Sequence, residues 1–146
     1  MSDWKSGLHY SDRTDVGMRR ANNQDSYASI PAKNADRFLQ RGHLFVVADG
    51  MGAHAAGELA SQIATEQIAL NYFRSSDDEP AEALRTAVIE SNAEIHQRGQ
   101  QNPEFHNMGT TASSLALLPE GAIVAHVGEI TIRSVGKISS PMFDLL

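Results

Sequence analysis

The pattern of hydrophobic and polar positions predicts a helical middle of the chain with strands before and after it. Residues 44–48 form an unbroken apolar run, which is typical of a short strand buried on both faces. Residues 31–41 before this run are polar and are expected to be a connection. Residues 57–73 favour a helix packed on the core, because apolar side chains recur there at helical spacing: Leu59, Ile63 and Leu70, with Ala60, Ala64 and Ile68 alongside.

A second helix and several strands are expected after residue 79. Pro80 suits a first helical turn, and Gly99 is expected to end the helix. One face of that helix is predicted to be buried, with Leu84, Val88, Ser91 and Ile95 on it. Residues 113–118 and 122–127 read as two strands of an antiparallel hairpin because only 119–121 separate them. Residues 130–135 are predicted to form a further strand, whereas the tail from 139 suggests no element.

Length and composition indicate one globular domain over residues 1–146, of which 41% are hydrophobic. The net charge of −6 argues against binding to nucleic acid or to anionic membranes. The absence of cysteine excludes disulfides, thiolate metal ligands and cysteine nucleophiles. No apolar run approaches the length of a membrane span, and the first residues lack a signal-peptide core, so a cytoplasmic location is expected.

Candidate chemistry begins where the apolar run of residues 44–48 ends. Asp49 follows it directly, and Gly50 and Gly52 make the next turn permissive. A carboxylate beside an approachable glycine carbonyl offers the oxygen ligands that Mg²⁺ and Mn²⁺ prefer. An ordinary strand ending in an Asp-Gly turn would look the same, and on this stretch alone that is the better interpretation.

A second polar stretch lies at residues 17–25. Arg20 has the side chain best shaped for bidentate contact with phosphate, and Asp25 and the amide oxygen of Gln24 are potential metal ligands. Taken alone, arginines in such a loop are more often solvated surface. His126 within a predicted strand is expected to be a structural or surface histidine.

Four motifs in a fixed order resemble the N-terminal half of the metal-dependent (PPM, or type-2C) protein serine/threonine phosphatases, in particular bacterial members. The resemblance covers about residues 14–128. The motifs are Gly17-x-x-Arg20-x-x-Asn23-Gln24-Asp25, then Asp49-Gly50-Met51-Gly52, then Met-Gly-Thr-Thr at 108–111, then Gly128-Glu129. Their joint occurrence is far more specific than any one of them.

This resemblance implies an α+β fold with an antiparallel β-sandwich flanked by helices, and two Mn²⁺ or Mg²⁺ ions in a cleft. Arg20 matches the arginine that holds the substrate phosphate, and Asp49 the carboxylate that bridges both metals. Gly50 matches the residue that ligates one metal through its carbonyl, and Asp25 the acidic position that supports the second. The implied reaction is the hydrolysis of phosphoserine and phosphothreonine in protein substrates by a metal-activated water.

Three departures from the family pattern bear on these expectations. Gln24 stands where many members carry Glu, and Glu129 stands where the family usually has the Asp linked to an accessory third metal. Family domains are also considerably longer, and their remaining metal-binding aspartates lie in a C-terminal half that Asp144 does not match. The chain is therefore expected to be a C-terminally truncated phosphatase domain whose exposed sheet edges allow association.

Three hypotheses remain open from the sequence. The first is a metal-dependent phosphatase represented by its N-terminal half, with little turnover of its own. The second is a non-catalytic phosphoprotein-binding or regulatory module that keeps Arg20 and a weak cation site. The third is an inactive, poorly folded truncation.

Overall fold

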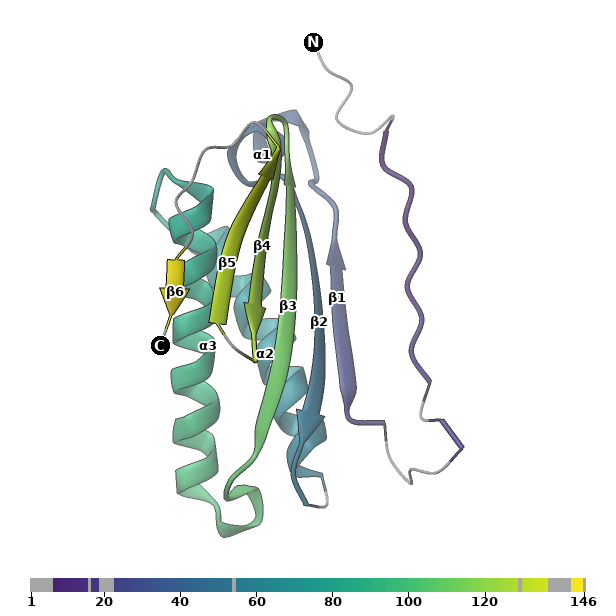
Figure 1. Ribbon diagram of the computed structural model, residues 1–146, viewed down its shortest axis with the longest axis vertical. Helices are drawn as coiled ribbons and strands as arrows, with labels where there is room; N and C mark the ends of the chain where they lie inside the picture. The colour runs from purple at the N-terminus through teal and green to yellow at the C-terminus, as the bar shows by residue number, and fades with distance from the viewer. Residues whose placement is uncertain are drawn as a thin grey trace.

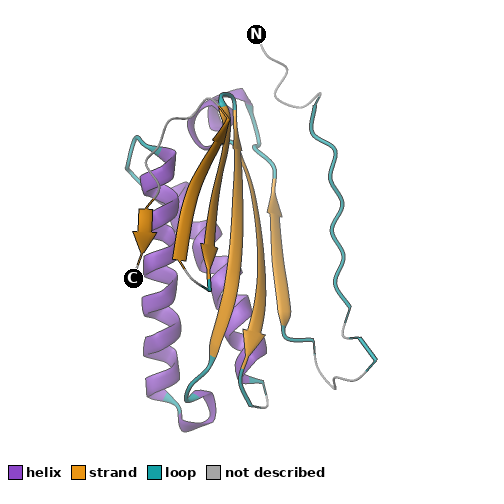
Figure 2. Ribbon diagram, in the orientation of Figure 1, coloured by secondary structure: helices purple, strands orange, loops and turns teal. Residues whose placement is uncertain are grey.

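The computed structural model describes residues 7–15, 17–18, 23–53, 55–128, 130–136 and 143–145. Strands and helices alternate in the first half of this region, and strands follow one another in the second (Figures 1 and 2). The elements are β1 (Asp25–Ile30), α1 (Ala35–Arg41), β2 (His43–Met51), α2 (Ala56–Arg74), α3 (Pro80–Gln101), the 3₁₀ turn η1 (Pro103–Phe105), β3 (Gly109–Leu118), β4 (Gly121–Val127), β5 (Ile130–Gly136) and β6 (Phe143–Leu145).

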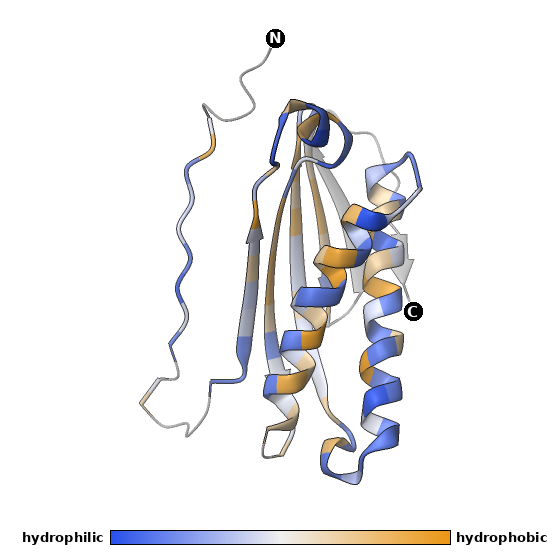
Figure 3. Cartoon of the chain, turned by 180° about the vertical axis from the view of Figure 1, so that it is seen from behind, coloured by the Kyte–Doolittle hydropathy of each residue, from blue (hydrophilic) through white to orange (hydrophobic). Residues whose placement is uncertain are grey.

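The six strands form one sheet in the order β1-β2-β3-β4-β5-β6, and each neighbouring pair is antiparallel. Helices α2 and α3 lie side by side against one face of the sheet (Figures 1 and 3). The α+β class with an antiparallel sheet and flanking helices is confirmed. The second sheet of the expected sandwich is not among the described residues.

Strand β2 alternates between the helix-covered face and the opposite face of the sheet, which we call the open face. Leu44, Val46 and Ala48 are buried under the helices, whereas Val47 is 58% exposed. The expectation that residues 44–48 are buried on both faces was therefore wrong. Successive strand residues point to opposite faces, and helices cover only one face of this sheet.

Both helices predicted from the hydrophobic pattern are confirmed, but the end expected at Gly99 was wrong, because α3 continues through Gly99 to Gln101. The face of α3 that carries Leu84, Val88, Ser91 and Ile95 is buried as expected, and Pro80 occupies its first turn. On α2 the pattern fails at Leu70, which is 46% exposed. In the part of the chain that the structure describes, no helix combines the length and the apolar character that a membrane crossing needs.

Helix α1 replaces part of the connection predicted for residues 31–41. Its N-cap is Asn34, whose side-chain oxygen accepts a hydrogen bond from the Arg37 backbone N–H at 2.9 Å. A helix of seven residues is too short to show a clear apolar period, so its end residues, such as this cap, were the local signals. Gly42 ends the helix with a φ of 70°, a left-handed conformation that favours glycine.

The predicted hairpin is confirmed as β3 and β4, with Leu118 paired to Gly121 across the turn. Strand β5 corresponds to the strand expected at residues 130–135. Strand β6 lies in the tail, for which no element was expected.

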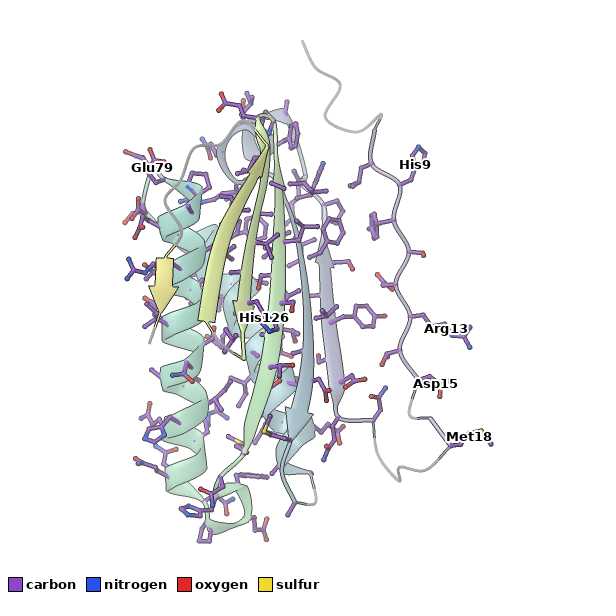
Figure 4. The ribbon with its side chains drawn as sticks, in the orientation of Figure 1. His9, Arg13, Asp15, Met18, Glu79 and His126 are labelled. Carbon is purple, nitrogen blue, oxygen red and sulfur yellow. The ribbon has the colours of Figure 1, made fainter. Side chains whose placement is uncertain are left out.

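The open face is partly apolar and is partly contacted by the extended N-terminal residues 7–15. Tyr10 packs edge-on against Phe45, with ring centroids 5.1 Å apart. The Asp12 carboxylate accepts a hydrogen bond from the Tyr27 hydroxyl, and this bond raises the pKa of Tyr27. Figures 1 and 4 show the segment running beside β1, with His9, Arg13 and Asp15 along it.

Tyr72 links α2 to the end of α1. Its buried hydroxyl donates a 2.6 Å hydrogen bond to the Arg41 carbonyl, and the Arg41 guanidinium lies 5.6 Å from the centre of its ring. That guanidinium is itself buried and donates to the carbonyls of Ser75 and Asp77. These contacts fix the connection between α2 and α3 against α1.

Tyr72→Phe is expected to lower the free energy of unfolding by about 1–2 kcal/mol, because the Arg41 carbonyl loses its buried donor. Urea titration of the variant measures this loss. Tyr10→Phe serves as a control because Tyr10 is 50% exposed, and its stability should stay within about 0.5 kcal/mol of the parent chain. Equal stability of the two variants would show that the buried hydrogen bond contributes nothing.

Burial also raises the pKa of Tyr72 above its ordinary value of 10. The neutral hydroxyl is therefore favoured in the folded chain, and its contribution to stability is complete below about pH 10 and decreases as the pH rises beyond it. The parent chain should lose more stability than Tyr72→Phe between pH 9 and 11.

Candidate metal centre at the β1–β2 edge

Asp25 and Asp49 lie directly opposite each other on neighbouring antiparallel strands. Both are exposed, and their positions in β1 and β2 place them on the open face. Two like charges directly across a strand pair repel each other. A cation between them would offset this repulsion, so the pairing of the strands creates an acidic site that neither stretch shows alone.

The turn after Asp49 packs closely against the start of α2. The Gly50 backbone N–H donates to the Gln24 carbonyl at 3.0 Å, which ties the end of β2 to the residue before β1. A Cβ on Gly50 would lie 1.9 Å from the Gly57 carbonyl oxygen. Gly52 has a φ of 151°. The glycines are therefore required by the close approach of two backbone segments and by the local conformation.

The Gln24 side chain holds this turn rather than extending into solvent. Its Nε2 donates to the Gly52 carbonyl at 3.1 Å, and its amide carbon lies 2.8 Å from the place of a Cβ on Gly57. Its predicted role as an oxygen ligand stays a prediction. The contact that the structure shows is structural.

Sequence reasoning assigned no role to Asn23, although this residue orders the approach to Asp25. Its Oδ1 accepts the Asp25 backbone N–H at 3.0 Å, and its Nδ2 donates to the Thr14 hydroxyl at 2.7 Å. On the other side, the Thr111 hydroxyl lies 3.5 Å from the Asp49 carbonyl. An asparagine two residues before a strand is the local signal that could have predicted the first of these contacts.

The donor set fits a hard divalent cation in kind. Carboxylates of Asp25 and Asp49 and the carbonyl of Gly50 are oxygen donors of the type that Mg²⁺ and Mn²⁺ prefer. In number the set is small, because no group of three or more Asp, Glu, His or Cys side chains that could hold a metal occurs among the described residues. Arg20 and Glu129 lie outside those residues, so the structure does not place either of them.

The Met-Gly-Thr-Thr stretch at residues 108–111 lies beside the site. Met108 is 8% exposed and belongs to the core, while Gly109 pairs with Met51 across β3 and β2. His126 is exposed on β4, and its Nδ1 lies 2.7 Å from the Ser113 hydroxyl on β3 (Figure 4). Of the two alternatives expected for His126, a structural or a surface histidine, its exposure favours the second.

Comparisons with known proteins show the family that the chain resembles. The family model described as protein phosphatase 2C matches residues 18–141. Protein phosphatase PhpP of Streptococcus pneumoniae is 36% identical over 122 residues, which are 82% of this chain and 47% of that protein. Serine/threonine protein phosphatase PstP of Mycobacterium tuberculosis is 35% identical over 127 residues, which are 84% of this chain.

Solved structures share the arrangement of the described elements. The crystal structure of PstP from Mycobacterium tuberculosis superimposes with a TM-score of 0.64 at 29% identity, over 86% of this chain and 52% of that one. Serine/threonine phosphatase Stp1 from Staphylococcus aureus gives a TM-score of 0.66 at 26% identity, over 84% of this chain and 50% of that one. A further structure contains the catalytic domain of PstP in complex with two manganese ions. The chain spans about half the length of PhpP.

Proposed function

Because the chain belongs to the protein phosphatase 2C family, we propose that its Asp25–Asp49 site takes part in the metal-dependent hydrolysis of phosphoserine and phosphothreonine in proteins. The observation that carries the proposal is the cross-strand pairing of the two carboxylates beside the glycine turn. PhpP and PstP are named as protein phosphatases, which supports the reaction class. The two manganese ions held by PstP support Mn²⁺ as the cation.

In this proposal different residues of the chain bind the cation and the phosphate group. Asp49, Asp25 and the Gly50 carbonyl would hold the cation, and the pairing of β1 with β2 places the two carboxylate-bearing residues opposite each other. Arg20 binds the phosphate oxygens through its planar guanidinium and orients the ester. A bound divalent cation would supply a water of lowered pKa and would offset charge on the phosphoryl oxygens. No covalent nucleophile is required, which agrees with the absence of cysteine.

The direct test is phosphate release from a phosphothreonine peptide with and without Mn²⁺. We expect release that needs both Mn²⁺ and Asp49, and that is lost in Asp49→Asn. The rate should be low for the 146 residues alone, because their described part supplies two carboxylates and the relatives are about twice as long. Release that is independent of Mn²⁺, or unchanged in Asp49→Asn, would contradict the proposal.

The small donor set also favours a second candidate function, the binding of phosphoproteins without turnover. Here Arg20 and one weakly held cation would bind the phosphate group. Fluorescence anisotropy should then show Mn²⁺-dependent binding of the phosphothreonine peptide, weakened about tenfold by Arg20→Ala, with no phosphate released. Arg13→Ala is a matched control, because Arg13 is an exposed arginine on the same N-terminal stretch. Equal binding of phosphorylated and unphosphorylated peptides would exclude this candidate.

A further inference from the structure

A groove of about 850 Å³ runs between the edge strand β1 and helix α2, on the side of the sheet that the helices cover. Asp25, Ser26, Tyr27 and Ala28 all line it. Consecutive strand residues point to opposite faces, so a groove that all four share must follow the backbone edge of β1. None of its lining residues belongs to the N-terminal segment 7–15, whose contacts with Phe45 and Tyr27 are on the open face.

The wall of this groove is apolar in the half that lies near the C-terminal end of α2. Leu70 is 46% exposed although it lies on a helix whose larger apolar side chains are otherwise mostly buried, and Ala69 and Phe73 also line the groove. Figure 3 shows β1 at the margin of the sheet with α2 alongside. Among the described strands β1 pairs with β2 alone, and an exposed leucine next to such an edge is the arrangement that proteins use to bind an extended peptide as an added strand.

The two ends of the groove carry opposite charge. Arg37 and Arg74 line one end, and neither forms an ion pair with a carboxylate in the part of the chain that the structure describes. The Arg37 guanidinium donates only a long hydrogen bond, 3.4 Å, to the Phe73 carbonyl. Glu58 lines the other end, and Glu66 lines the middle of the groove, eight residues from both Glu58 and Arg74. From Glu58 to Arg74 the helix is about 24 Å long, which matches a strand of about seven residues.

We propose that this groove, lined by β1 and α2, binds an extended segment of a partner protein as an additional antiparallel strand. Every pairing between described strands is antiparallel, and this direction places the N-terminal end of the segment at Arg37 and Arg74. The segment that fits therefore has an acidic residue first, apolar residues at the alternate positions that face Leu70, and a basic residue last, near Glu58. This proposal is independent of the phosphatase function.

The experiment uses a fluorescein-labelled heptapeptide, acetyl-Asp-Thr-Ile-Thr-Val-Thr-Lys-amide, and measures its fluorescence anisotropy against the 146-residue chain. Its Asp, Ile, Val and Lys residues occupy alternate positions, so in an added strand all four side chains would face α2. We expect saturable binding, and about tenfold weaker binding of a peptide with Asp and Lys exchanged. Equal affinity of the two peptides would overturn the proposal.

Variants of the chain locate the binding site. Leu70→Glu and the double variant Arg37→Glu, Arg74→Glu are each expected to weaken binding of the first peptide at least tenfold. Ile89→Glu is the matched control, because Ile89 has the same 46% exposure but lies on α3. Loss of binding in Ile89→Glu as large as in Leu70→Glu would overturn the assignment.

Peptide chemistry provides a test that does not depend on the folding of variants. N-methylation at alternate residues removes N–H donors on one edge of the peptide only. Methylation of one alternate set should abolish binding, and methylation of the other set should leave it within about twofold. Equal tolerance of both sets would show that no strand is added to β1.

Discussion

Gly50→Ala is expected to destabilise the folded chain by roughly 3 kcal/mol or more. Its Cβ would lie 1.9 Å from the Gly57 carbonyl oxygen, 2.5 Å from the carbonyl carbon and 2.8 Å from the Gln24 carbonyl oxygen. All three are backbone atoms, so no side-chain rotation relieves the overlap. Either β2 or the start of α2 must move, and with it the 3.0 Å hydrogen bond from the Gly50 N–H to Gln24.

Gly109→Ala is the matched control for this substitution. Gly109 is also a strand glycine near the site, but the nearest atom to its Cβ would be the Met51 Cγ at 3.5 Å, an ordinary van der Waals contact. Urea unfolding followed by circular dichroism compares the two variants. The free energy of unfolding of Gly50→Ala should fall by roughly 3 kcal/mol or more, whereas that of Gly109→Ala should stay within about 1 kcal/mol of the parent. Similar values for both would show that the β2–α2 contact is not tight.

The helices and the hairpin could be predicted because their signals are local. The face of α3 that includes Leu84 and Ile95 repeats at helical spacing, and the two residues between β3 and β4 allow only a tight reversal. Helix α1 could not be predicted from periodicity, since its seven residues contain two turns at most.

Exposure was the part of the fold that the sequence predicted least well. Val47 belongs to an apolar run and Leu70 to an apolar helix pattern, yet both are about half exposed. An apolar side chain shows that a position can be buried, but not which element covers it. Val47 lies on the open face, and Leu70 lies beside β1, which among the described strands pairs with β2 alone.

The candidate site was predicted in its components but not in its geometry. Asp49 was identified from the turn that follows it, and Asp25 from a motif 24 residues earlier. Nothing local indicates that the two are directly opposite, because that register follows from the pairing of β1 with β2 as a whole. The contacts of Asn23 and Gln24 likewise depend on where the β2–α2 turn comes to lie.

Asp49→Asn is expected to separate two effects of the Asp25–Asp49 pair on stability, the repulsion between the carboxylates and the binding of a cation. Without a divalent cation, removal of one of two facing carboxylates should leave stability unchanged or raise it by a few tenths of a kcal/mol. With Mn²⁺, the parent chain should gain stability as the cation binds, by about 2.7 kcal/mol at a hundredfold excess over its dissociation constant. The variant should lose nearly all of this gain, because it keeps one carboxylate.

The most direct test of the account is therefore a thermal unfolding series over increasing Mn²⁺, in the parent chain, in Asp49→Asn and in Asp77→Asn. Asp77 is an exposed aspartate on the connection between α2 and α3, away from the site, and serves as the control. We expect a melting temperature that rises with Mn²⁺ in the parent chain and in Asp77→Asn, and stays constant in Asp49→Asn. The same rise in all three proteins would contradict a cation site built on Asp49.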